Sequence, residues 1–250
     1  MNTSKLIFRQ LFEPISCTWT YLLGCSTTKN AVIIDPVLET IERDYKIIKQ
    51  LNLNLIYGLN THVHADHVTS TGELKNIFPK MKSILSILTN DSKADIYVDE
   101  NDIINFGKNY LKILQTPGHT NGCISYINHD YKMIFTGDAL LIRGCGRTDF
   151  QEGNPRTLYR SIHDKIFTLP DDYLIYPGHD YTGQTVSSVG EEKQFNQRLI
   201  VDENEFVEIM KNLNLPYPKQ IDKAVPANKV CGIQEMMDEK LKEMVFGKKK

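Results

Sequence analysis

Five of the seven histidines lie in three short motifs, and two aspartates accompany them. Residues 61–67 read T-H-V-H-A-D-H and place three imidazoles and a carboxylate close together. Residues 118–120 read G-H-T, residues 178–180 read G-H-D, and Asp138 ends a T-G-D run. Imidazole and carboxylate are the usual ligands of zinc, iron and manganese. The sequence therefore predicts a metal site with more donors than one ion needs, namely His62, His64, Asp66, His67, His119, Asp138 and His179.

Each group of donors follows a segment that reads as a β-strand. Strands are predicted over residues 54–59, 110–115, 132–135 and 173–176, shortly before His62, His119, Asp138 and His179. Further strands are expected over residues 18–23, 31–34 and 123–127. Proline and glycine beside the donors favour tight turns. Because chemistry is usually carried by loops at strand ends, we expect the four strand ends to converge on one rim.

Amphipathic segments between these strands predict helices. Their expected ranges are residues 38–51, 72–78, 155–167, 203–213 and 233–246. The chain of 250 residues contains no internal repeat and no clear linker. We expect a single domain over residues 1–250, with about residues 181–250 as a C-terminal extension packed on the same domain.

Bulk properties argue against several classes of protein. A net charge of −2 gives no general attraction to nucleic acid or anionic membranes, and no apolar run approaches the roughly 18 residues of a membrane-spanning helix. Five cysteines without a C-x-x-C pair favour a reducing compartment over a disulfide framework. Residues 1–6 are too short and polar for a secretory signal and do not form an Arg-rich presequence.

The donors, in chain order, resemble the signature of the metallo-β-lactamase superfamily. The resemblance covers roughly residues 7–180 and implies an α+β fold, an αβ/βα sandwich of two mixed β-sheets flanked by helices, with metal at one edge. In that superfamily the full set can hold two metal ions. The first would bind His62, His64 and His119, the second Asp66, His67 and His179, with Asp138 bridging.

Longer stretches resemble the persulfide (sulfur) dioxygenase branch, which is related to glyoxalase II. They are residues 12–14 (F-E-P), 136–151, 176–181 and 225–228 (V-P-A-N). The branch implies one Fe(II) per chain, held by His62, His119 and Asp138. Two histidines and one carboxylate leave positions open for dioxygen and a substrate sulfur. The resemblance then leaves His64, Asp66, His67 and His179 to orient ligands and assist proton transfer, while spacing alone leaves a second metal ion open.

The implied reaction oxidises glutathione persulfide with O₂ and water to sulfite and glutathione. The resemblance places Arg147, Tyr181 and Asn228 at the substrate. An arginine can bind a glutathione carboxylate, and the alternative for Arg147 is an ion pair with Asp149. The resemblance also implies a homodimer. It implies the mitochondrial matrix for a eukaryotic protein, and a cytoplasmic location is expected otherwise.

The alternative function is a glyoxalase II-type hydrolase, which would cleave hydroxyacylglutathione thioesters at a dinuclear metal site built from the same residues. A scaffold without catalysis is disfavoured, because such a chain would be free to lose donors and every one is present. Cys145 and Cys231 lie near the predicted site, and the sequence leaves open whether their role is structural or redox.

Overall fold

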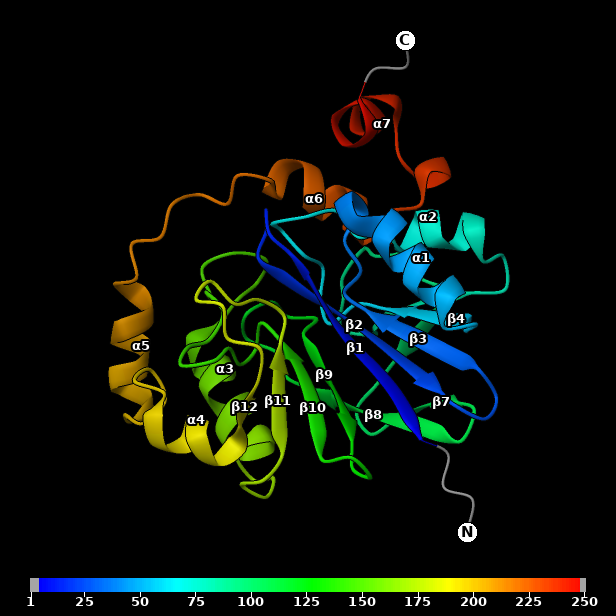
Figure 1. Cartoon of the computed structure of the whole chain (residues 1–250). Coiled ribbons are helices and arrows are strands. Elements are labelled where there is room, and N and C mark those ends of the chain that lie inside the picture. The colour runs from blue at the N-terminus through cyan, green and yellow to red at the C-terminus, as the bar shows by residue number, and fades with distance from the viewer. Residues whose placement is uncertain (1–4, 248–250) are drawn as a thin grey trace.

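Two six-stranded sheets form the centre of the computed structural model, which describes residues 5–247 (Figure 1). Residues 1–4 and 248–250, which include the start of the N-terminal stretch discussed above, lie outside the described residues. The first sheet has the order β1-β2-β3-β4-β5-β6. Its strands are β1 (Leu6–Glu13), β2 (Thr18–Cys25), β3 (Asn30–Ile34), β4 (Asn54–Leu59), β5 (Lys82–Ser86) and β6 (Ile96–Val98).

The second sheet has the order β12-β11-β10-β9-β8-β7. Its strands are β7 (Ile103–Phe106), β8 (Asn109–Gln115), β9 (Ile124–Asn128), β10 (Met133–Gly137), β11 (Leu174–Pro177) and β12 (Ser187–Ser188). Both sheets are mixed. In the first, β3 pairs with β4 in parallel and β1 with β2 antiparallel; in the second, β10 pairs with β11 in parallel and with β9 antiparallel.

The main core lies between the sheets. Tyr21 and Leu59 of the first sheet pack there with Ile113, Tyr126 and Phe135 of the second. The Tyr21 and Phe135 rings are 4.9 Å apart between centroids. Burying each such large apolar side chain stabilises the fold by about 1.5–3 kcal/mol.

Helices cover the outer faces of both sheets. The first sheet is covered by α1 (Ile41–Gln50), after the 3₁₀ turn Leu38–Thr40, and by α2 (Thr71–Ile77). The second is covered by α3 (Pro155–Ser161), the π-helical turn Ile162–Ile166, α4 (Val189–Phe195) and α5 (Glu203–Lys211). This helix–sheet–sheet–helix arrangement confirms the predicted αβ/βα sandwich.

The C-terminal part packs beside the loop that follows β4. A small apolar cluster joins Val68 of that loop to α6 (Ile221–Lys229) and to α7 (Glu239–Phe246). The predicted helix over residues 233–246 is wrong in its first half, which forms a 3₁₀ turn at Gln234–Met236. Asp238 is extended, and its side chain caps α7 by accepting from the Leu241 N–H, so the α-helix begins only after it.

Two observations on the described residues concern the cysteines and the lengths of the helices. All five cysteines are free. Within residues 5–247 no helix is long and apolar enough to cross a membrane.

Candidate metal centre

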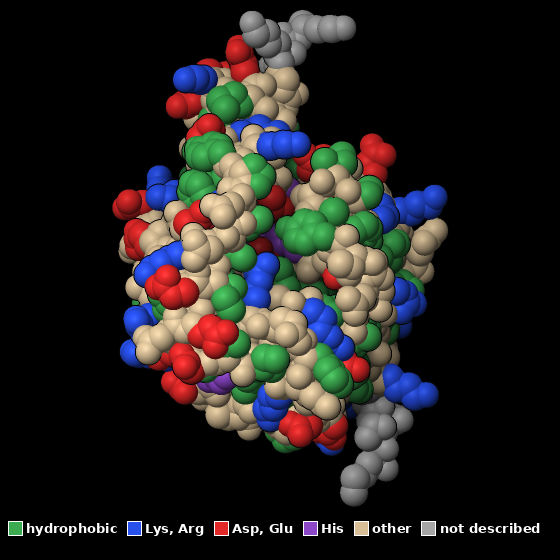
Figure 2. All heavy atoms as spheres, turned by 90° about the vertical axis from the view of Figure 1, so that its left-hand side faces the viewer, with side chains coloured by type: hydrophobic (Ala, Val, Ile, Leu, Met, Phe, Trp, Pro, Cys, Tyr) green, Lys and Arg blue, Asp and Glu red, His purple; other side chains and the backbone are tan. Residues whose placement is uncertain are grey.

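The four predicted strand ends meet at one edge of the two sheets. His62 follows β4, whereas His119, Asp138 and His179 follow β8, β10 and β11, which run in the same direction. In Figure 2, histidine and acidic side chains are visible at the bottom of a hollow bordered by hydrophobic side chains. The seven donors form two groups, with ligand atoms within 4.8 Å of one another in each. The first group is His62, His119 and Asp138; the second group is His64, Asp66, His67 and His179.

Glycines allow the backbone to approach closely at these turns. Gly118, before His119, has a φ of +135°, and a Cβ there would lie 2.3 Å from the Leu158 backbone in α3. Gly137, before Asp138, has a φ of +52°, and a Cβ would lie 2.5 Å from Thr61 Oγ1. Only glycine fits both the conformation and the space at these two positions.

Both imidazoles of the first group have Nδ1 anchored, which leaves Nε2 available. The Thr61 hydroxyl donates its one proton to Asp35 Oδ2 at 2.8 Å, so it accepts from His62 Nδ1 at 3.0 Å. His119 Nδ1 donates to the Arg147 carbonyl at 2.6 Å. Each ring therefore carries its lone pair on Nε2, the usual arrangement for a metal ligand held by an outer partner.

The charge states of the first group suit a cation. Burial lowers the pKa of His62 well below its usual value, and His64 and His119 lower it further, so this ring is neutral. Burial alone would raise the pKa of Asp138, but His179 and His119 outweigh it and lower that pKa overall. The group thus offers neutral imidazole and an ionised carboxylate.

Two buried nitrogens in the second group fit a metal or a bound water. His64 Nε2 donates to Asp35 Oδ1 at 3.0 Å, which places the lone pair of this ring on Nδ1. His64 Nδ1 and His67 Nε2 are both buried without a hydrogen-bond partner among residues 5–247. Burying a polar atom without a hydrogen-bond partner costs free energy. Such nitrogens are therefore expected where a bound metal ion or water supplies the missing partner.

Hydrogen bonds join the remaining atoms of the second group. Asp66 Oδ2 accepts from His67 Nδ1 and from His179 Nε2, each at 2.8 Å. His179 Nδ1 donates to Asp138 Oδ1 at 2.6 Å. Burial would lower the pKa of His179, but the two carboxylates raise it well above its usual value. His179 thus bridges the two groups with both ring nitrogens engaged.

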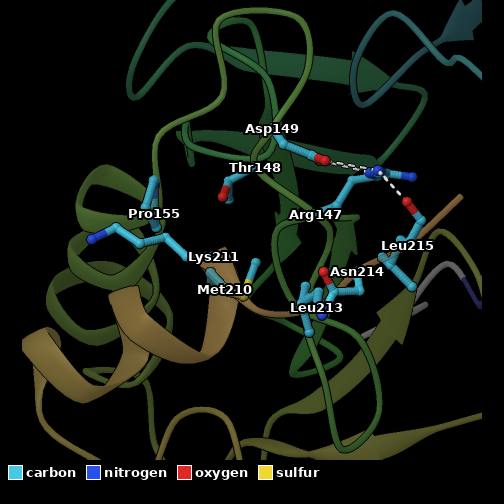
Figure 3. Close-up of a pocket in the computed structure, with 9 residues that line it drawn as sticks. All are labelled: Arg147, Thr148, Asp149, Pro155, Met210, Lys211, Leu213, Asn214 and Leu215. Carbon is cyan, nitrogen blue, oxygen red and sulfur yellow. Dashed lines mark hydrogen bonds and ion pairs between the residues drawn. The ribbon is translucent and has the colours of Figure 1, made fainter. Parts of the chain in front are cut away.

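Arg147 borders the site but its guanidinium is already paired. Its Nε and one Nη donate to Asp149 at 2.7 Å each, and the other Nη donates to the Pro216 carbonyl at 2.8 Å. Arg147 and Asp149 line a pocket of about 400 Å³ together with Leu213 and Asn214, and Figure 3 shows the ion pair at one side of it. The alternative considered for Arg147, an ion pair with Asp149, is present, and contact with a substrate stays a prediction.

The other two predicted substrate residues differ in exposure. Tyr181 is 70% exposed, and its ring lies parallel to that of His179 with centroids 6.2 Å apart. Asn228 is buried, and its amide donates to the carbonyls of His64 and His67 at 2.9 and 2.7 Å and accepts from the Thr69 N–H at 2.8 Å. Its amide therefore holds the donor loop, and a substrate contact by Asn228 stays a prediction.

Sequence reasoning missed two residues that organise the site. Asp35 fixes Thr61 and His64, and its position directly after β3 was a usable signal, since the other site residues also follow strands. Thr18, at the start of β2, contacts three donors of the second group. No motif or spacing in the sequence marks Thr18, because a hairpin brings it to the site.

The two cysteines near the site are not activated thiols. Burial raises the pKa of Cys145 to about 11 and that of Cys231 to about 12. A protonated, buried thiol is a poor nucleophile. The structural alternative is therefore favoured for both.

The layered fold and its His/Asp edge define the class of the protein. A model of the Metallo-beta-lactamase superfamily matches residues 17–179. The human protein named "Persulfide dioxygenase ETHE1, mitochondrial" is 56% identical over 231 residues, which cover 92% of this chain and 91% of that protein. A crystal structure of ETHE1 from Myxococcus xanthus is 50% identical, with a TM-score of 0.87, and the match covers 90% of this chain and 99% of that one.

A more distant relative is a hydrolase. The Haemophilus influenzae protein named "Hydroxyacylglutathione hydrolase GloC" is 37% identical over 67% of this chain and 86% of its own length. The dioxygenase relatives match at higher identity and extend over the C-terminal part as well. The chain belongs to the metallo-beta-lactamase superfamily and, within it, to the persulfide dioxygenases.

Proposed function

We propose that the protein is an Fe(II)-dependent dioxygenase that oxidises glutathione persulfide with O₂ and water to sulfite and glutathione. We assign one Fe(II) per chain to His62, His119 and Asp138. The observation that carries this assignment is the contrast between the two donor groups. Both imidazoles of the first group present an unengaged Nε2 beside the Asp138 carboxylate, whereas in the second group His179 has both ring nitrogens engaged and Asp66 Oδ2 accepts from His67 and His179. Two imidazoles and one carboxylate are the ligand set of non-haem Fe(II) oxygenases.

The iron, when bound, supplies the redox chemistry by which dioxygen oxidises the terminal sulfur. The protein's own contribution is to hold the ligands in place. His62 is fixed through Thr61 and His119 through the Arg147 carbonyl, so neither ring needs to reorient to present Nε2. Preorganised ligands of this kind keep the metal affinity high, and loss of an outer partner typically costs about 10–100-fold in affinity or activity.

Protons must also be handled, because the reaction consumes water and releases protons. His179 is buried between Asp138 and Asp66. The Asp66 side chain is 33% exposed and so reaches solvent. These three residues form a continuous hydrogen-bonded path from the first group to water, and we assign proton transfer to it.

The substrate enters over Tyr181 and beside the Arg147 pocket. The exposed Tyr181 ring supplies a surface for the peptide part of glutathione persulfide. A substrate carboxylate would compete with Asp149 for the Arg147 guanidinium, since the planar fork binds one carboxylate well. The pocket volume of about 400 Å³ is within the usual range for a small-molecule site.

A hydroxyacylglutathione hydrolase is the second candidate. Two observations favour it: the similarity to GloC and the presence of a complete second donor group. That function needs two metal ions and no dioxygen. Metal content and oxygen consumption therefore separate the two candidates.

The proposal is tested with protein expressed with iron and zinc both available. Elemental analysis should give about one iron per chain, the stoichiometry of a facial-triad site. Addition of glutathione persulfide should cause oxygen uptake, with His62→Ala as the control variant. Uptake no greater than that of the control would rule the proposal out.

Compartment and assembly belong to the same proposal. The human, mouse and bovine relatives are named mitochondrial, and we place this enzyme in the mitochondrial matrix if its source is eukaryotic. We also expect a homodimer, which light scattering of the purified protein tests.

A further inference from the structure

A loop joins Asp138 to Arg147, and it serves the metal centre at both of its ends. Asp138 belongs to the first donor group, and the Arg147 carbonyl accepts from His119 Nδ1 at 2.6 Å. The backbone groups of a loop must find hydrogen-bond partners outside a helix or a sheet ladder. The partners that this loop finds therefore decide where the Arg147 carbonyl lies.

Three consecutive residues in the middle of the loop are each held by a different side chain from α4 or from the turn after it. The pairs are the Arg143 N–H with Glu192 Oε2 at 2.8 Å, the Gly144 carbonyl with Asn196 Nδ2 at 3.0 Å, and the Cys145 carbonyl with Arg198 Nη1 at 2.8 Å. The end of α4 thus follows the loop residue by residue.

The spacing of these side chains explains how one helix reaches the loop. Glu192 and Asn196 are four residues apart and so lie on the same face of α4 and its first residue beyond. Both side chains are buried, and Asn196 Nδ2 also donates to Glu192 Oε2 at 2.8 Å. The other carboxylate oxygen of Glu192 pairs with the Arg143 guanidinium. A buried charge is tolerated when it is paired and hydrogen-bonded in this way.

The loop needs such support because its conformation is strained. Arg143 has a φ of +57°, in the left-handed region that is unfavourable for a residue with a side chain. Leu141 and Gly144 also exchange two backbone hydrogen bonds across the turn, at 3.0 and 3.3 Å. A strained residue persists only where its surroundings hold it, and here α4 supplies part of that hold.

The held residues are packed tightly against two donors of the first group. Gly146 alone separates Cys145 from Arg147, and its N–H donates to the Asp138 carbonyl at 2.8 Å. A Cβ at Gly146 would lie 2.5 Å from that carbonyl and 2.8 Å from His119 Nδ1. A shift of Cys145 would therefore be passed on to the contacts with Asp138 and His119.

We propose that Glu192, Asn196 and Arg198 are positioning residues of the metal centre. By holding the backbone of residues 143–145, they set the place of the Arg147 carbonyl and, through it, the orientation of the His119 ring. They act through the loop, and the metal ligands stay the same. The inference rests on the proposed function, which assigns the metal to His119.

Arg198 is the residue to vary, because it is only partly buried. Arg198→Met keeps the aliphatic stem without a donor, whereas Arg198→Lys keeps a charged donor. Each metal-free protein is titrated with Co²⁺, and its visible absorption gives the Kd and reports the coordination geometry. Arg198→Met should raise the Kd about 3–10-fold, less than the roughly 10–100-fold typical of losing the outer partner of a ligand itself. Its absorption bands should shift, and Arg198→Lys should stay close to the wild type in both respects.

Lys193→Met is the matched control. Lys193 also lies on α4, but it donates to Asp171 at 2.7 Å and to the Leu169 carbonyl at 3.4 Å, in the segment before β11. This variant should leave the Kd and the bands unchanged, and urea unfolding compares the stability of the variants. If Arg198→Met does not fold, Asn196→Ala takes its place with the same expectation.

His119→Ala separates this inference from the proposed function. If His119→Ala binds Co²⁺ with the Kd and bands of the wild type, the assignment of the metal to His119 fails, and the proposed function fails with it. If His119→Ala weakens binding but a folded Arg198→Met, or Asn196→Ala in its place, matches the wild type, only the inference is overturned. Equal weakening in Arg198→Met and Arg198→Lys, or in Arg198→Met and Lys193→Met, also overturns it, because the donor to the loop would not be the cause.

Discussion

His179 donates a hydrogen bond of 2.6 Å from Nδ1 to Asp138 Oδ1, and this bond joins the two donor groups. Asp138 belongs to the proposed iron site, whereas His179 belongs to the second group. The imidazole therefore acts on the metal through the carboxylate that it orients. Both ring nitrogens of His179 are hydrogen-bonded to carboxylates, so neither is available to bind a metal ion in this arrangement.

His179→Gln tests this role. The variant loses the bridge between Asp138 and Asp66 but keeps all three proposed iron ligands. We expect it to retain iron at reduced affinity and to lose about 10–100-fold in affinity or kcat, the usual cost of losing an outer partner of a ligand. Metal titration and oxygen-uptake kinetics measure both quantities, and unchanged values for both would contradict the assignment.

Arg147 variants test the substrate contact. Arg147→Ala should raise KM far more than Arg147→Lys, because lysine retains the charge while losing the planar fork. Asp149→Asn is the matched control, since it frees the guanidinium and should lower KM or leave it unchanged. Equal KM values for the two Arg147 variants, with a lowered thermal midpoint for both, would instead assign Arg147 to holding Asp149 and the Pro216 carbonyl.

Gly118→Ala should destabilise the fold at the turn that presents His119. The new Cβ would lie 2.3 Å from the backbone of Leu158, and the φ of +135° disfavours any side chain. A residue held in such a region costs on the order of 1–3 kcal/mol, before the clash is counted. Urea unfolding measures the loss. Gly183→Ala serves as the control, because its φ is also positive but a Cβ there meets nothing within 4 Å.

Asp44 gives a pH dependence of stability away from the site. Burial raises the pKa of this α1 carboxyl from 3.8 to about 6, although the neighbouring Arg43 acts to lower it. The folded state therefore binds the proton more tightly than the unfolded state. The resulting stabilisation is fully present below pH 3.8 and is lost as the pH rises through about 6.

The comparison of wild type with Asp44→Asn isolates this effect. Relative to the variant, the metal-free wild type should gain up to about 3 kcal/mol of unfolding free energy as the pH falls from about 8 to about 4. Urea unfolding at a series of pH values measures the difference. A difference that is constant with pH, or that shrinks on acidification, contradicts the raised pKa.

Much of the site could be predicted from the sequence, because the donors follow strands directly and the strand ends meet at one edge. His62, His119, Asp138 and His179 all lie where the alternation of strands, turns and helices places them. The helices over residues 203–213 and 72–78 are also close to the observed α5 and α2. Periodic apolar positions and glycine-containing turns are local signals, and they remain readable without knowledge of distant contacts.

Other parts of the structure depend on distant contacts and could not be predicted. The strands β5, β6 and β7 are short and were not predicted, and α6 contains Pro226, which disfavours a helix in local sequence. Thr18 reaches the site only because backbone hydrogen bonds join the β1–β2 hairpin to the loop after β11. From the sequence, Arg147 could bind either a substrate carboxylate or Asp149. The fold shows that Arg147 pairs with Asp149 and also donates to the Pro216 carbonyl.

The most direct test of the central claim is a simultaneous measurement of dioxygen consumed and sulfite formed by the iron-loaded protein supplied with glutathione persulfide. The account predicts that the two are equal in amount, that both stop when oxygen is removed, and that His62→Ala abolishes both. Turnover of a glutathione thioester under anaerobic conditions, without oxygen-dependent sulfite from the persulfide, would contradict it.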